Sequence, residues 1–91
     1  MSDVVARNVK VHGRVQGVFF RDSTQRRAAA RGVAGWVRNC RDGSVEAHLE
    51  GPRSAVHSLV EFLHEGPRGA SVERVEVHDA EPEGLQTFEV R

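Results

Sequence analysis

The chain has 91 residues, and its thirteen basic and thirteen acidic side chains cancel to a formal net charge of zero. This length predicts a single domain spanning 1–91, and the lack of a basic excess argues against a nucleic-acid partner. One cysteine cannot form an internal disulfide, which fits a reducing cytoplasm, and the sequence shows neither a signal peptide nor a membrane-spanning stretch.

The first part of the chain predicts a strand, a loop and a helix. Residues 1–7 are interpreted as a loose arm. Val9, Val11 and Gly13 alternate with polar residues over 9–14, which is the period of a half-buried strand. Residues 22–31 predict a helix, because Asp22 suits its first turn, a run of three alanines has high helix propensity, and Gly32 suits its end.

The second part predicts a hairpin, a second helix and two further strands. The hairpin signal is Asp42-Gly43 between two alternating segments, because such turns require positive φ. The apolar stripe of the second helix follows Pro52 and ends before Gly66. The predicted strands are 33–41, 44–51, 72–77 and 87–90.

This order predicts an α+β fold of the ferredoxin-like, split β-α-β type (βαββαβ). We expect an antiparallel sheet with two helices on one face, a solvated opposite face, and a short extra C-terminal strand. The fold alone does not define a function.

The stretch from Gly13 to Arg21 joins the first strand to the first helix. A glycine-containing turn at a helix start can direct several backbone N–H groups into one concavity, which suits a phosphate-sized anion. Arg21 adds a planar fork of donors. The spacing matches neither G-x-x-x-x-G-K-[ST] nor G-x-G-x-x-G, so a plain strand–helix connection and an anion cradle both remain open.

Two motifs in register resemble those of the acylphosphatase family. Residues 15–21, V-Q-G-V-F-F-R, are similar to its V-Q-G-V-x-F-R signature. Residues 35–39, G-W-V-R-N, followed by the turn and Ser44-Val45, resemble its G-W-V-x-N…G-x-V signature. The resemblance extends over nearly the whole chain, apart from the aromatic residue that often follows the family's last arginine.

The resemblance implies hydrolysis of acyl phosphates to a carboxylate and inorganic phosphate, without metal or cofactor. It implies that Arg21 contacts the phosphoryl group and that the amide of Asn39 positions the attacking water. The phosphate cradle would be formed by N–H groups of Gln16, Gly17, Val18, Phe19 and Phe20. We expect little room for a Cβ at Gly17, inorganic phosphate as product and inhibitor, and a monomer.

Other interpretations of these residues stay open at this point. Asn39 can serve a strand end by bonding its own backbone. The fold also suits a non-catalytic binding or regulatory domain for single-stranded nucleic acid or a small anion, for which Trp36 could be a stacking platform. His57, Glu61 and His64 share a helical face, which predicts a solvated surface rather than a metal site because no H-E-x-x-H pattern is present.

Overall fold

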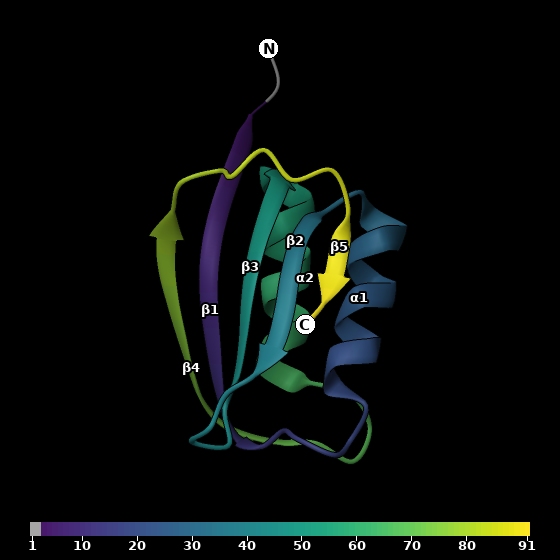
Figure 1. The fold of residues 1–91 in the computed structure, drawn as a ribbon, viewed down its shortest axis with the longest axis vertical. Helices are drawn as coiled ribbons and strands as arrows, with labels where there is room; N and C mark the ends of the chain where they lie inside the picture. The colour runs from purple at the N-terminus through teal and green to yellow at the C-terminus, as the bar shows by residue number, and fades with distance from the viewer. Residues whose placement is uncertain (1–2) are drawn as a thin grey trace.

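A computed structural model gives the arrangement of the elements and describes residues 3–91 (Figure 1). They follow the predicted order and confirm the α+β ferredoxin-like class. In chain order they are β1 (Val4–Arg14), α1 (Phe20–Arg31), β2 (Ala34–Asn39), β3 (Val45–Pro52), α2 (Arg53–Glu65), β4 (Ser71–Ala80) and β5 (Phe88–Val90).

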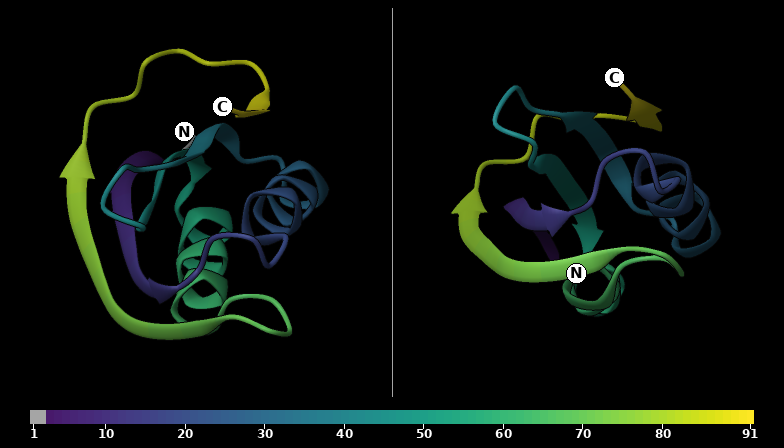
Figure 2. Two further views of the ribbon diagram at one scale, coloured as in Figure 1. Left: turned by 60° about the horizontal axis from the view of Figure 1, so that its bottom comes forward. Right: turned by 90° about the horizontal axis from the view of Figure 1, so that it is seen from below.

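The sheet has the strand order β4-β1-β3-β2-β5. Its four long strands pair antiparallel, as predicted, whereas β5 pairs parallel to β2, so the whole sheet is mixed. Both helices lie on one face of this sheet (Figures 1 and 2). This arrangement brings β5 beside α1, although the two elements are far apart in the sequence.

The start of β1 corrects one prediction. Residues 4–7 belong to this strand, where they pair with residues 49–52 of β3, so they do not form a loose arm. Arg7 also pairs with Asp79 of β4 in the sheet, and their side chains approach to 3.3 Å. Positions 1 and 2 of the predicted arm lie outside the described residues.

The core lies between the sheet and the helices. Alternate residues of β1 and β3 fill it from the sheet side, and α2 adds the stripe that its spacing predicts. The buried face of α1 is small, because it consists of Phe20, Thr24 and Ala28. The hydroxyl of Thr24 donates to the carbonyl oxygen of Phe20 at 2.8 Å, so no polar group of this face is left unpaired.

Gly35 shows why the second signature begins with glycine. It lies in β2 directly beside β3, with φ 144°, a conformation that side chains rarely adopt. A Cβ at this position would collide with the main-chain oxygen of His48. A glycine therefore lets the strand that ends at Asn39 pair closely with β3.

Residues 81–87 form a segment that we call the strap. It runs from β4 at one sheet edge to β5 at the other, across the face opposite the helices (Figures 1 and 2). The carboxylate of Glu50 accepts hydrogen bonds from the N–H groups of Glu83 and Leu85, each at 2.8 Å, and lies 2.6 Å from His48 Nε2. Glu50 and His48 are both buried.

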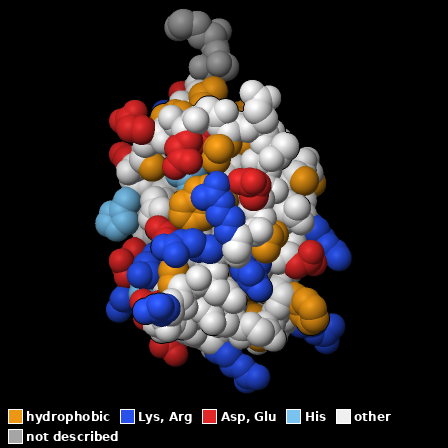
Figure 3. Space-filling view, viewed as in Figure 1, with side chains coloured by type: hydrophobic (Ala, Val, Ile, Leu, Met, Phe, Trp, Pro, Cys, Tyr) orange, Lys and Arg blue, Asp and Glu red, His pale blue; other side chains and the backbone are white. Residues whose placement is uncertain are grey.

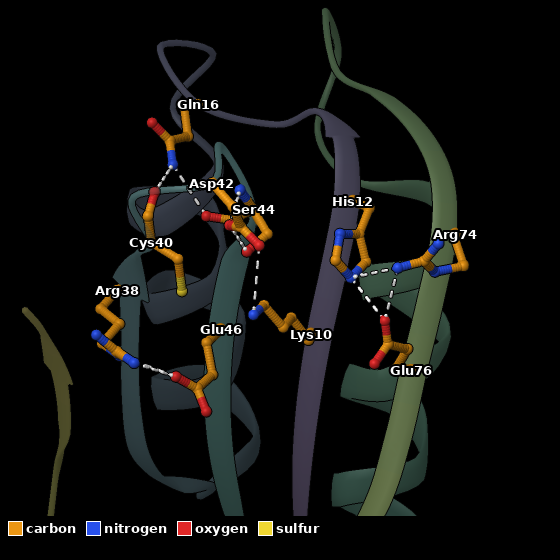
Figure 4. Close-up of polar contacts among 10 residues, drawn as sticks. All are labelled: Lys10, His12, Gln16, Arg38, Cys40, Asp42, Ser44, Glu46, Arg74 and Glu76. Atoms are coloured by element: carbon orange, nitrogen blue, oxygen red, sulfur yellow. Dashed lines mark hydrogen bonds and ion pairs between the residues drawn. The ribbon is translucent and has the colours of Figure 1, made fainter.

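The rest of that open face carries charged side chains of both signs (Figure 3). They form ion pairs. Arg38 of β2 lies 2.6 Å from Glu46 of β3, and Lys10 of β1 lies 3.4 Å from Asp42 in the turn between β2 and β3 (Figure 4). The ring of Trp36 stacks on His48 with centroids 6.1 Å apart. The guanidinium of Arg91 lies 5.1 Å from the Trp36 centroid, so this ring is not a free platform for a base.

Candidate active site

The loop between β1 and α1 turns its backbone through two left-handed residues. Gly17 has φ 74° and Phe19 has φ 62°. Within residues 3–91, the N–H groups of Gly17, Val18 and Phe19 donate to no main-chain oxygen. Helix α1 starts at Phe20 without a side-chain cap. The positive end of a helix and adjacent free donors thus lie together, which is the arrangement that attracts anions.

The side chain of Gln16 joins this loop to the turn between β2 and β3. Its Nε2 donates to the carbonyl oxygens of Cys40 and Ser44 at 2.8 and 2.9 Å (Figure 4). The amide side chain therefore faces the turn, and only the backbone of Gln16 could serve a cradle. Because Cys40 follows Asn39 directly, these bonds also hold the loop next to Asn39.

The turn itself is fixed by Asp42. Its carboxylate accepts hydrogen bonds from the hydroxyl of Ser44 at 2.5 Å and from the N–H of the same residue at 3.0 Å. These bonds, with Lys10 nearby, lower the pKa of Asp42 to about 2. The N–H of Cys40 donates to the Ser44 carbonyl at 2.8 Å. Cys40 thus lies in the turn, just after β2 ends at Asn39, whereas the predicted strand continued to residue 41.

Arg21 lies in the first turn of α1 and reaches across to Arg91, the residue after β5. Its Nη1 donates to the main-chain oxygen of Arg91 at 3.0 Å. Arg91 in turn donates its N–H to the Val37 carbonyl of β2 at 2.8 Å, which holds that end of the chain against the sheet. Among residues 3–91 this contact uses one of the five guanidinium N–H groups, which leaves four for a ligand.

Asn39 is the last residue of β2, and its side chain is exposed. Within residues 3–91 its amide forms no side-chain hydrogen bond, so the structure does not support the interpretation of a strand-end residue that bonds its own backbone. Asn39 and Arg21 line the same hollow, which has a volume of about 470 Å³. Its full lining is Val15, Gly17, Phe19, Phe20, Arg21, Asp22, Asn39 and Val90.

Gly17 corrects a second prediction. No atom lies within 4 Å of where a Cβ would be, so there is room for one. The positive φ of 74° is the reason that glycine suits this position. The open space beside it belongs to the hollow.

The predicted solvated helix face is observed on α2, where His57 and Glu61 are exposed and 3.3 Å apart. Within residues 3–91, no group of three or more metal-ligating side chains converges. Among the same residues, no helix is long and apolar enough to cross a membrane.

Comparison with known proteins decides the family. A model of the acylphosphatase family matches residues 7–90. The chain belongs to the acylphosphatase family. It is therefore an enzyme and a hydrolase, and its similarity to curated members extends over the full fold.

An acylphosphatase from Haloarcula marismortui is 55% identical over 84 residues, which cover 92% of each chain. One from Natronomonas pharaonis is 50% identical over 91 residues, covering 100% of this chain and 99% of that one. The solved structure of an acylphosphatase from Coxiella burnetii superposes with a TM-score of 0.93 at 39% identity, and covers 97% of this chain and 93% of the other.

The structure of this acylphosphatase brings together most of the site residues that the two motifs predict. Of these, Gly17, Phe19, Phe20, Arg21 and Asn39 line the hollow, while Gln16 faces the turn and Val18 packs against the core. Sequence reasoning missed the Arg91 contact and the lining by Val90. The signal for both would have been the parallel pairing of β5 with β2, which alternation alone does not specify.

Proposed function

We propose that the chain hydrolyses acyl phosphates in this hollow, with Arg21 and the loop binding the phosphoryl group and Asn39 holding the attacking water. Acylphosphatase activity follows from family membership. The observation that carries the assignment of the site is that Arg21 and Asn39 line one hollow at the uncapped start of α1.

The phosphoryl group would be bound by the free N–H groups of Gly17, Val18 and Phe19 together with Arg21. These donors match the charge on the phosphoryl oxygens, which the protein must hold and neutralise as the bond breaks. The contact between Arg21 and Arg91 supports this role, because a guanidinium that is already oriented loses less entropy on binding. Only this chain's own side chains and backbone are required.

In the chemical step, the oxygen of water forms a bond to phosphorus while the bond from phosphorus to the bridging oxygen breaks. The bridging oxygen leaves with the electron pair as part of a carboxylate, which is a good leaving group and needs no strong general acid. Asn39 orients the water in line with the leaving oxygen. A phosphoryl oxygen accepts the proton of the water, because among the described residues no His or Glu lines the hollow and the one carboxylate there, Asp22, pairs with Arg26 at 3.1 Å.

The products are a carboxylate and inorganic phosphate, and the latter would compete with substrate for the same donors. We also propose that the enzyme acts as a monomer in the cytoplasm, where Cys40 stays reduced. The rival interpretation, a nucleic-acid-binding domain, is disfavoured because Trp36 is occupied by His48 and Arg91.

Steady-state hydrolysis of benzoyl phosphate, with inhibition by phosphate, tests the proposal. We expect Asn39→Ala to lower kcat about a hundredfold, the effect of losing one positioned donor, with the phosphate inhibition constant nearly unchanged. Asn8→Ala is the matched control, since Asn8 lies on the open face and bonds Glu46. Near-native kcat in a folded Asn39→Ala protein would rule out this role.

Arg21 is tested in the same assay. Arg21→Ala should weaken phosphate inhibition and lower kcat at least a hundredfold, because the guanidinium contacts the phosphoryl group in both ground and transition states. Arg21→Lys should restore little, since an ammonium lacks the planar fork. Arg31→Ala, at the other end of the same helix, is the control. Full activity in Arg21→Lys would show that charge alone is needed.

A further inference from the structure

Phe19 combines high exposure with a place in the hollow. We propose that its ring is a specificity-determining platform that binds the acyl group, and that the enzyme therefore prefers acyl phosphates with an aromatic or other apolar acyl group. The inference rests on the proposed function of the same hollow. Phe19 is 81% exposed, the highest value among the large hydrophobic residues of the described chain that are exposed.

The neighbouring phenylalanine behaves in the opposite way. Phe20 is 2% exposed and packs in the core, with its ring centroid 6.4 Å from that of Phe62. Within residues 3–91, the Phe19 ring has neither an aromatic nor a cationic partner. The hydrophobic effect accounts for the burial of Phe20, whereas it opposes the exposure of Phe19.

The backbone of Phe19 is also unfavourable for its side chain. It is the one non-glycine residue of the described chain with positive φ, at φ 62° and ψ 26°. A bulky residue in this region is an outlier, and such strain persists chiefly at functional sites. The position precedes α1, where Gly or Asn would fit the conformation and Asn could also cap the helix. The helix start therefore does not explain a phenylalanine here.

The residues that line the hollow are of two chemical kinds. Arg21, Asn39 and the backbone of Gly17 suit a phosphoryl group and a water. Phe19 and Val90, which is itself 43% exposed, add apolar surface to the same hollow. A site that combines anion-binding groups with apolar groups matches a ligand that carries both a phosphate and an apolar group.

The size of the hollow supports the same conclusion. Its volume of about 470 Å³ falls within the roughly 300–1,000 Å³ that is usual for sites of small organic ligands. A phosphoryl group bound by the loop and Arg21 would fill only part of this space, and the exposed ring of Phe19 lines the same hollow, within reach of an acyl group. An aromatic acyl group could stack on the ring, whereas an acetyl group would cover little of it.

The test compares benzoyl phosphate with acetyl phosphate. We expect Phe19→Ala to lower kcat/KM for benzoyl phosphate about tenfold, mainly through KM, because an aromatic contact of this kind is lost. Phe19→Ala keeps the main-chain N–H of residue 19, so the loss on acetyl phosphate should be smaller, and the readout is the ratio of the two kcat/KM values, which should fall severalfold. Phe19→Trp should retain the preference for benzoyl phosphate.

Two further variants separate the ring from the backbone. Phe19→Gly removes the ring and relieves the backbone strain. It should show the same selective loss of kcat/KM for benzoyl phosphate as Phe19→Ala, and it should unfold at a urea concentration equal to or higher than that of Phe19→Ala. Val77→Ala removes another exposed apolar side chain, on β4, and should leave both substrates unaffected.

The outcomes distinguish this inference from the function on which it rests. Equal losses on benzoyl and acetyl phosphate would show that Phe19 only shapes the phosphate loop, and unchanged kinetics would show that the ring is unused. Either result overturns the inference and leaves the proposed function intact. A wild-type protein that hydrolyses neither acyl phosphate would overturn both.

Discussion

Glu50 offers a direct test of how the strap is held, through the substitution Glu50→Gln. Its side chain is 6% exposed, and its two oxygens accept from Glu83, Leu85 and His48. An amide has one acceptor oxygen, so its NH₂ group would face at least one N–H donor. One hydrogen bond is then lost, and the remaining bonds no longer have a charged acceptor. A hydrogen bond to a charged group is worth about 1.5–3 kcal/mol, so the free energy of unfolding should fall by about 2–3 kcal/mol.

Urea unfolding monitored by Trp36 fluorescence measures this cost, because the single tryptophan stacks on His48 next to Glu50. A loss of 2–3 kcal/mol should lower the midpoint by about 1–2 M urea for a protein of this size. Glu81→Gln is the matched control, since Glu81 is an exposed carboxylate in the same strap. If both variants unfold at the same urea concentration as the parent, the buried bonds contribute nothing measurable and the reasoning is wrong.

Three other predictions concern the loop, pH and metal ions. Gly17→Ala should lower stability by about 1–2 kcal/mol, the cost of a left-handed L residue, and should weaken phosphate inhibition; unaltered urea unfolding would contradict this. Stability should fall as the pH is lowered from about 4 to about 2. The pKa of Asp42 is about 2 in the folded protein, against 3.8 as its ordinary value. The Asp42 carboxylate therefore stabilises the fold above pH 3.8, and this contribution is lost as the folded carboxylate is protonated. Asp42→Asn should flatten this part of the stability–pH curve. Finally, EDTA should leave benzoyl phosphate hydrolysis unchanged, and a loss restored by a divalent cation would overturn the metal-independent mechanism.

The sequence was sufficient to predict the order of the elements, because periodicity and turn residues are local signals. Strand ends were predicted less well. Apolar and polar residues do not alternate over residues 4–8, so the start of β1 was missed. These residues are extended because they pair with β3, which the local pattern does not show. β4 likewise extends to Ser71–Ala80 because it pairs along β1, which overrides weak local preference.

The candidate site was predicted in part for the same reason. Arg21 and Asn39 followed from two motifs, whose residues are close in sequence to recognisable turns. The contact of Arg21 with Arg91 joins residues 70 positions apart and depends on where β5 pairs, which no local pattern specifies. His48 and Glu50 occupy positions that alternation assigns to the solvated face, yet the strap buries them.

The strand order has a consequence for how the protein folds. The central strands β1 and β3 are separated in the sequence by a helix and another strand, and Val9 pairs with Val77 on the other side. Long loops must therefore close before the sheet gains its pairing energy, so folding should be slower than that of helical bundles, whose contacts are local. Since the guanidinium of Arg21 is held by a residue beyond β5, a partly folded chain can contain the phosphate loop without an oriented Arg21. Catalytic activity should then recover with the slowest refolding phase rather than with the appearance of helix.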